Sequence, residues 1–194
     1  MDLVNEHPST VEDKLIVVTF KLPINIDKDE KGFYNIKPSK SILNTNLFNL
    51  QKRNPVMKTQ WIGWPGIFVD DDKEQEQVRE LLAKENCIPI FCNKKLVMDY
   101  LLFHEQILRP LFHNFTSLES NFEKDDEALW QAYSQFNFLY LEPIMSIMNI
   151  NDFVWIHDTY LLLLPKYVRR QCINARIGFS MHSPFPSSDI YRMF

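Results

Sequence analysis

The sequence has few cysteines and few glycines, and both shortages exclude kinds of site. The three cysteines, Cys87, Cys92 and Cys172, are odd in number and form no Cys-x-x-Cys pair, which excludes a disulfide framework and a zinc knuckle. We therefore predict structural thiols in a reducing cytoplasm. The four glycines form no phosphate-binding P-loop motif, and the sequence has no spacing typical of a catalytic triad or a metal cage.

Long apolar runs and a strong excess of one charge are also missing. No apolar run approaches the roughly 20 residues that a membrane-spanning helix needs. Residues 1–13 are polar and lack the apolar core of a signal peptide, so we predict a flexible N-terminal segment and a soluble, cytoplasmic protein. The formal net charge of −4 gives no overall attraction to nucleic acid or to an anionic membrane, and neither is a predicted partner. Any phosphate site must be local.

Hydrophobic residues make up 45% of the 194 residues, which suits one domain with a buried core. Apolar runs predict strands at residues 14–20, 33–36, 59–69, 87–92, 153–156 and 176–181. Helical spacing predicts helices at residues 74–84, 96–115, 125–149 and 160–171, and weakly at 38–54. Residues 25–32 predict a hairpin or loop. The alternation of strands and helices predicts an α/β fold with a mostly parallel sheet covered on both faces.

Three prolines qualify these predictions. Pro89 favours an edge or terminal position for its strand, because proline has no N–H to donate. Pro110 and Pro143 predict breaks or kinks in their helices for the same reason.

Polar side chains follow three of the predicted strands. Lys21 comes directly after the first strand, His157 and Asp158 follow the strand at 153–156, and His182 follows the strand at 176–181. The carboxyl ends of parallel strands lie at one edge of the sheet, where the loops form a ligand crevice. We therefore predict that the reactive residues meet at this edge.

Two of these residues can act on a sugar, and each has a structural alternative. His182, followed by Pro184 and Pro186, can hydrogen-bond a sugar hydroxyl or a charge, or simply satisfy a loop carbonyl. Asp158 can accept hydrogen bonds from sugar hydroxyls, about twice as strongly as a neutral acceptor. Its alternative is to cap the helix that follows.

Two runs carry a family resemblance. The first is Val-Trp-Ile-His-Asp at residues 154–158, and the second is Gly-Phe-Ser-Met-His-Ser-Pro-Phe-Pro-Ser-Ser-Asp-Ile-Tyr-Arg at residues 178–192. Both resemble the paired motifs of trehalose-6-phosphate synthases, retaining glycosyltransferases of family 20 that move glucose from UDP-glucose onto glucose 6-phosphate. The resemblance extends from about Lys14 to the last residue.

The resemblance implies roles for five residues. In the family, the histidine at the position of His182 contacts the donor sugar, and the aspartate at the position of Asp158 binds the acceptor. A tyrosine at the position of Tyr100 lies against the acceptor. Arg109 replaces a tryptophan that contacts glucose 6-phosphate; an arginine can fork onto phosphate, or it can be a surface charge. Lys21 replaces an arginine that binds phosphate.

Other positions also depart from the family pattern. The family reads Asn-Arg-Leu-Pro at residues 20–23, where this chain has Phe-Lys-Leu-Pro. It reads Phe-Ser-Asn at residues 103–105, where this chain has Phe-His-Glu, and Tyr-His at residues 159–160, where this chain has Thr-Tyr. Only Gly32 lies between residues 23 and 61, so the flexible backbone that would pack against a diphosphate is absent. This region resembles divergent synthase-like domains, often fused to a phosphatase domain, whose activity is reduced or lost.

The resemblance also implies a domain plan. Residues 14–194 are expected to form a Rossmann-like acceptor-side domain, the N-terminal half of a GT-B glycosyltransferase. The chain ends at Phe194 inside the second motif, so we expect a partial chain without the C-terminal donor domain. That domain holds the basic residues that bind the diphosphate, so the chain alone is expected to be inactive.

Two functional hypotheses follow. The first is the acceptor-side part of a UDP-forming α,α-trehalose-phosphate synthase, with a sugar phosphate and a nucleotide sugar as ligands and no cofactor, since UDP-glucose is the donor substrate. The alternative is a catalytically inactive regulatory or scaffold domain of a trehalose synthase complex, which binds sugar phosphate weakly or binds a partner subunit.

Overall fold

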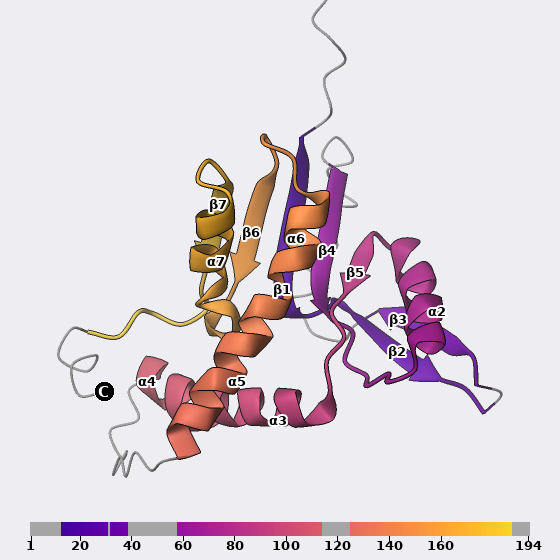
Figure 1. The fold of residues 1–194 in the computed structure, drawn as a ribbon, viewed down its shortest axis with the longest axis horizontal. Helices are drawn as coiled ribbons and strands as arrows, with labels where there is room; N and C mark the ends of the chain where they lie inside the picture. The colour runs from indigo at the N-terminus through magenta and orange to yellow at the C-terminus, as the bar shows by residue number, and fades with distance from the viewer. Residues whose placement is uncertain (1–12, 31, 39–57, 114–124, 188–194) are drawn as a thin grey trace, which may run out of the picture.

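A five-stranded parallel sheet forms the centre of the computed structural model, which describes residues 13–30, 32–38, 58–113 and 125–187 (Figure 1). All neighbouring strands of this sheet run parallel. In spatial order they are β5 (Cys87–Pro89), β4 (Lys58–Trp64), β1 (Lys14–Lys21), β6 (Phe153–His157) and β7 (Arg176–Ser180). The predicted parallel α/β fold is confirmed, as is the edge position of the strand that contains Pro89.

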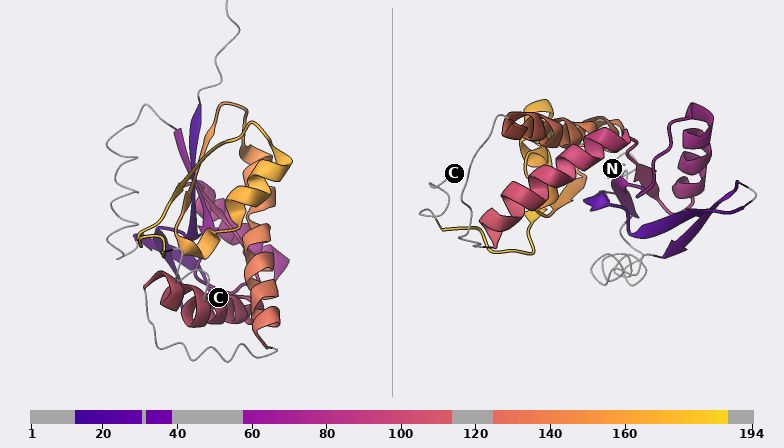
Figure 2. Two further views of the ribbon diagram at one scale, coloured as in Figure 1. Left: turned by 90° about the vertical axis from the view of Figure 1, so that its left-hand side faces the viewer. Right: turned by 90° about the horizontal axis from the view of Figure 1, so that it is seen from below.

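The sheet is buried on both faces. Ile16 and Val18 of β1 belong to a core cluster shared with the helices, whereas Val17, between them, belongs to a second cluster with Trp61. Successive side chains of a strand point to opposite faces, so the continuous apolar run of β1 fills both clusters. Val78 and Leu82 of helix α2 (Asp72–Ala83) complete the second one. Figure 2 shows helices α5 (Asp125–Leu139), α6 (Leu141–Ile147) and α7 (Leu164–Gln171) on the other face.

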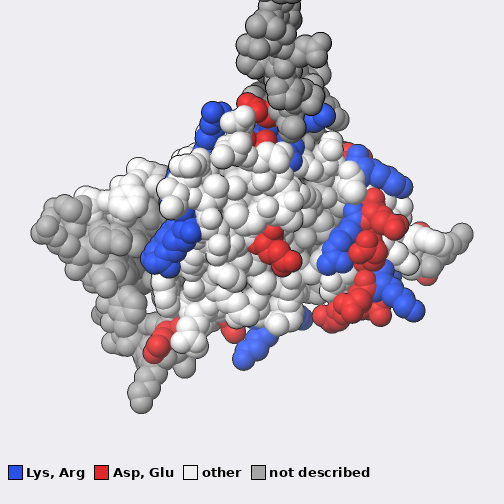
Figure 3. Space-filling model, turned by 45° about the horizontal axis from the view of Figure 1, so that its top comes forward, with Lys and Arg blue, Asp and Glu red and all other residues white. Residues whose placement is uncertain are grey.

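The predicted hairpin is present as an antiparallel pair, β2 (Ile24–Lys28) and β3 (Tyr34–Pro38). The hairpin contacts helix α2 next to its loop. The ammonium of Lys28, at the end of β2, and the hydroxyl of Tyr34, at the start of β3, both donate to Glu74, each at 2.7 Å. Charged side chains of both signs are interspersed on this side of the molecule (Figure 3).

The predicted helix at 96–115 is interrupted before Pro110 instead of at it. Helix α3 (Lys94–Phe103) continues into a π-helical turn, η1 (His104–Leu108), and then into α4 (Arg109–Phe112). The N–H of Arg109 donates to the carbonyl of His104, five residues earlier. Pro110 has no N–H to offer the preceding turn and its ring crowds that turn, so the irregularity lies on its N-terminal side. Residues 114 and 115 lie outside the described part.

Two other predicted helices are divided. The helix at 125–149 is divided at Tyr140 into α5 and α6, as Pro143 predicted. The prediction of one continuous helix at 160–171 was wrong. The segment contains a 3₁₀ turn, η2 (Thr159–Leu161), and then helix α7. Pro165, near the start of α7, cannot donate to the carbonyl four residues earlier, which separates the two. The weak helix predicted at 38–54 falls almost wholly on residues that the structure does not describe.

Within the described ranges, no helix is long and apolar enough to cross a membrane.

Candidate functional site

Three of the predicted site residues lie at one edge of the sheet. Strands β1, β6 and β7 are neighbours, and all three run in the same direction. Lys21 is the last residue of β1, and Asp158 directly follows β6. His182 lies two residues beyond the end of β7. The parallel topology therefore brings these three side chains to the same edge, as the sequence predicted.

Asp158 turns the chain out of the sheet. Its backbone has a φ of 69°, a region that costs a non-glycine residue roughly 1–3 kcal/mol and is common at ligand sites. Its N–H donates to the Ser180 carbonyl at 2.7 Å. Its Oδ1 accepts from the Thr159 N–H at 2.8 Å, which caps the 3₁₀ turn. The capping alternative is thus observed, and among the described residues Oδ2 has no hydrogen-bond donor.

Lys21 is held by the turn after β4. This turn contains Gly66, which has a φ of +83°, and the half-buried Lys21 side chain lies directly over it. A Cβ at this position would lie 2.8 Å from the Lys21 Nζ and closer still to its Cε. The absence of a side chain at Gly66 therefore makes room for the lysine. The Lys21 ammonium makes no hydrogen bond to the residues that the structure describes.

Two histidines lie side by side at the ends of β6 and β7. The ring of His182, which is exposed, lies 6.4 Å from the ring of His157 at an interplanar angle of 23°. His157 is only 5% exposed. Burial lowers the pKa of His157 to about 4, and the nearby charge of His182 acts in the same direction. His157 is therefore neutral near pH 7.

Tyr100 lies beneath this edge rather than on its surface. Its side chain is 0% exposed, its ring stacks on Phe136 at 4.0 Å, and its hydroxyl donates to the Tyr160 carbonyl at 2.9 Å. Burial raises the pKa of the Tyr100 hydroxyl, which keeps it a neutral donor. Tyr100 thus supports the loop after Asp158 from below, and its contact with an acceptor stays a prediction.

Arg109 is a surface residue at the boundary between η1 and α4. Its side chain is 55% exposed, and its Nη1 lies 2.6 Å from an oxygen of Glu105. This ion pair lowers the pKa of the Glu105 carboxyl. The surface-charge alternative describes this arrangement, although the guanidinium has further N–H groups that a phosphate could use.

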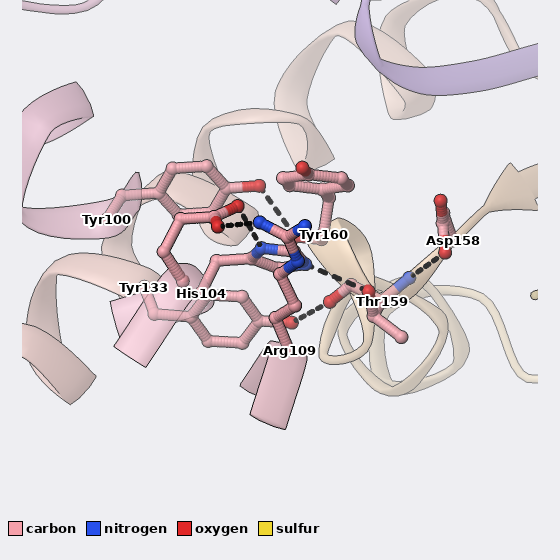
Figure 4. Close-up of polar contacts among 8 residues, drawn as sticks. Tyr100, His104, Arg109, Tyr133, Asp158, Thr159 and Tyr160 are labelled. Carbon is pink, nitrogen blue, oxygen red and sulfur yellow. Dashed lines mark hydrogen bonds and ion pairs between the residues drawn. The ribbon is translucent and has the colours of Figure 1, made fainter. Parts of the chain in front are cut away.

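His104 links these helices to the sheet edge, and sequence reasoning did not single it out. The residue is 4% exposed, its Nε2 lies 2.9 Å from the Thr159 hydroxyl, and its ring stacks on Tyr160 at 3.7 Å. Burial lowers its pKa. Figure 4 shows His104 joined to Thr159, whose N–H is bonded to Asp158. On its other side, His104 is linked to Arg109 through Glu105. The available signal was its position one helical turn after Tyr100.

A cavity of about 340 Å³ opens elsewhere, beside the carboxyl end of β5 and the start of α3. Arg79, Asn93 and Glu142 contribute polar groups to its wall, and none of the five predicted site residues lines it. Within the described ranges, no group of three or more His, Cys, Asp or Glu residues could hold a metal ion.

Comparison with known proteins connects this geometry to a family. The model of glycosyltransferase family 20 matches residues 13–194. The 56 kDa subunit of UDP-forming α,α-trehalose-phosphate synthase from Kluyveromyces lactis is 41% identical over 97% of this chain and 38% of its own length. The corresponding subunit from Saccharomyces cerevisiae is 38% identical over 92% of this chain and 36% of its own length. The chain thus spans well under half the length of these relatives.

Solved structures agree on the fold. The N-terminal domain of trehalose-6-phosphate phosphatase from Candida albicans is 29% identical, with a TM-score of 0.76 over 97% of this chain and 38% of that one. A Burkholderia xenovorans trehalose-phosphate synthase in complex with glucose-6-phosphate gives a TM-score of 0.63 over 92% of this chain and 35% of that one. At 18% identity, the second likeness speaks for the fold alone. The predicted Rossmann-like, GT-B-type fold is confirmed.

Proposed function

Because the chain belongs to glycosyltransferase family 20, we propose that it is the acceptor-side half of a UDP-forming α,α-trehalose-phosphate synthase that binds glucose 6-phosphate. The observation that carries this proposal is the arrangement of Lys21, Asp158 and His182 at the ends of three strands that follow one another in the sheet. Glucose transfer is proposed for the whole protein, of which this chain supplies the acceptor side.

Each of the three residues has a proposed role that its surroundings support. The Lys21 ammonium, which has no competing partner in the described part of the chain, pairs with the acceptor phosphate. The Oδ2 of Asp158 accepts from an acceptor hydroxyl, and such charge-assisted bonds are the stronger ones. His182, which is exposed, faces the donor glucose.

The proposed reaction needs no protein nucleophile. The acceptor hydroxyl oxygen forms a bond to C1 of the donor glucose while the bond from C1 to the diphosphate breaks on the same face, which retains the configuration. The hydroxyl proton passes to the departing diphosphate oxygen. The residues of this chain hold the acceptor in line for that attack, so their contribution to the rate is positioning.

An Asp158→Asn variant tests the acceptor role. Asparagine keeps an oxygen that can cap Thr159 and loses the charge. We expect glucose 6-phosphate to bind about five- to tenfold more weakly in a calorimetric titration, the difference between a charged and a neutral hydrogen bond. Asp27→Asn, in the exposed hairpin pair with Lys37, is the matched control. Equal affinity of Asp158→Asn and the unchanged chain would count against the role.

A second function is favoured by the contacts of two residues that were predicted to bind the acceptor. Arg109 is paired with Glu105, and Tyr100 has no exposed surface, so two predicted acceptor contacts are engaged within the chain. Such a chain suits a non-catalytic regulatory or scaffold domain of a trehalose synthase complex. The family residues can be restored in the full-length protein with Lys21→Arg and Arg109→Trp. Turnover that rises on this double change supports a lost activity, and unchanged turnover contradicts that explanation.

A further inference from the structure

A short hydrogen-bond chain at the end of β6 and β7 leaves one buried nitrogen without a partner. The Trp155 indole Nε1 donates to the Ser180 hydroxyl oxygen at 3.1 Å. The same oxygen lies 3.2 Å from Nδ1 of His157, the residue paired with Ser180 in the sheet register. The other ring nitrogen of His157, Nε2, is buried and has no hydrogen-bond partner among the described residues.

The chain of partners favours a hydrogen on Nε2 of His157. An indole N–H can only donate, so the Ser180 oxygen accepts from Trp155. The Ser180 hydroxyl still has a hydrogen to donate, and Nδ1 of His157 is the only acceptor for it in the described part of the chain. If Nδ1–H donated to Ser180 instead, that hydroxyl hydrogen would have no acceptor there. A neutral imidazole whose Nδ1 accepts carries its hydrogen on Nε2. Nε2–H is therefore a buried donor that points away from Ser180.

A buried donor without an acceptor is unfavourable, and such groups in native proteins call for an explanation. The position of His157 supplies one. It is the last residue of β6, it precedes Asp158, and its ring lies beside that of His182. The atom is covered by the chain, so a ligand oxygen at this end of β6 would satisfy Nε2–H once the neighbouring side chains make room for it.

We propose that the Nε2–H of His157 donates to a hydroxyl oxygen of the sugar bound at this edge, which makes His157 a further binding residue of the site. A sugar hydroxyl both donates and accepts, so one hydroxyl can donate to Asp158 and accept from the neighbouring His157. The inference rests on the proposed sugar-binding function. It adds a neutral donor whose direction is set by Ser180 and, through Ser180, by Trp155.

Nitrogen-15 NMR of the imidazole tests the inference without any substitution. The Nε2–H tautomer of His157 is expected at pH 7, and both glucose and glucose 6-phosphate should shift the Nε2 and Hε2 resonances on binding, since both carry the hydroxyls. Inorganic phosphate should leave them in place. An Nδ1–H tautomer, an Nε2 resonance that bound sugar does not move, or a response to phosphate alone would each overturn the inference.

Two substitutions separate the donor from the ring. His157→Phe keeps a ring and removes the donor, and we expect it to weaken the binding of both sugars by about three- to tenfold, the loss of one hydrogen bond. His157→Gln places an amide N–H near the lost Nε2 and should retain most of the affinity. Ser134→Ala, which removes a hydroxyl partner of Tyr167 between α5 and α7, is the matched control and should bind like the unchanged chain. A His157→Gln variant as weak as His157→Phe would contradict a donor role.

The outcomes distinguish this inference from the proposed function. A chain that binds neither sugar overturns both. A chain that binds sugar while His157 does not respond overturns only the role of His157.

Discussion

The ring of Tyr160 stacks on the ring of Phe20, with centroids 4.8 Å apart and an interplanar angle of 12°. His104 stacks on Tyr160 as well, at 3.7 Å and 10°. Two rings cannot share one face at these distances, so Tyr160 lies between them. All three positions differ from the family pattern given by the sequence resemblance. That pattern has asparagine at the position of Phe20, serine at that of His104 and histidine at that of Tyr160. The departures that looked independent in the sequence are one packing unit beside Asp158.

This stack should be energetically coupled. In a double-mutant cycle of Phe20→Leu and Tyr160→Leu, we expect a coupling free energy of about 0.5–1.5 kcal/mol beyond the sum of the single changes. Urea unfolding of the four proteins measures it. Phe33→Leu, at an exposed hairpin position, combined with Tyr160→Leu is the control pair, for which coupling should be near zero. Additive changes for Phe20 and Tyr160 would show that the stack contributes no more than separate burial.

Asp152 joins the start of β1 to the start of β6 and should be a strong contributor to stability. It is 1% exposed and accepts from the backbone N–H groups of Lys14 at 2.8 Å and Asn149 at 2.7 Å. Asp152→Ala leaves both donors without this acceptor, so we expect a loss of about 2–4 kcal/mol in the free energy of unfolding. Asp27→Ala, in an exposed ion pair, should cost less than about 1 kcal/mol. A similar cost for the two changes would contradict this role.

Stability should fall as the pH is lowered from about 6.5 to about 4. The pKa of His157 is lowered from 6.5 to about 4 by burial. Between these values the unfolded chain binds a proton that the folded chain does not, so the free energy of unfolding rises with pH in this window. His157 contributes at most about 3 kcal/mol across it, and His104, with a pKa lowered by burial, adds in the same direction. Urea unfolding at several pH values measures the slope. The His157→Phe variant should show a smaller slope of the free energy of unfolding against pH. An unchanged slope in that variant would contradict a contribution from His157.

The parallel sheet and its polar edge were predictable because their signals are local. The apolar runs of β1 and β6 and the polar residues after them lie within a few positions of each other in the sequence. The parallel direction of neighbouring strands then places Lys21, Asp158 and His182 at one edge without any knowledge of side-chain contacts.

The contacts around that edge were not predictable in the same way, because they join residues far apart in the sequence. The stack of His104 on Tyr160 and the hydrogen bond from Tyr100 to the Tyr160 carbonyl depend on how α3 crosses the loop after β6. The burial of Tyr100 follows from the same packing, and no periodicity in the sequence reports it. The π-helical turn at His104 also depends on this packing. Pro110 disturbs the helical turn before it, and the stacking of His104 on Tyr160 holds the side chain of that turn in place.

The thiols of Cys87 and Cys92 should resist alkylation in the folded protein. Burial raises the pKa of each to about 12, so the reactive thiolate is scarce at pH 8. Mass spectrometry after brief treatment with iodoacetamide should find both unmodified in buffer and modified in urea. Rapid modification of either residue in buffer would contradict the burial on which this expectation rests.

An acceptor-phosphate site at Lys21 is tested by a calorimetric titration of this chain with glucose 6-phosphate, with glucose as the comparison ligand. We predict saturable binding that is stronger for glucose 6-phosphate than for glucose. Lys21→Ala should remove this preference, whereas Lys166→Ala, at an exposed position of α7, should keep it. No binding at millimolar glucose 6-phosphate by a folded chain, or equal binding by the unchanged chain and Lys21→Ala, would contradict an acceptor-phosphate site at the carboxyl edge of the sheet.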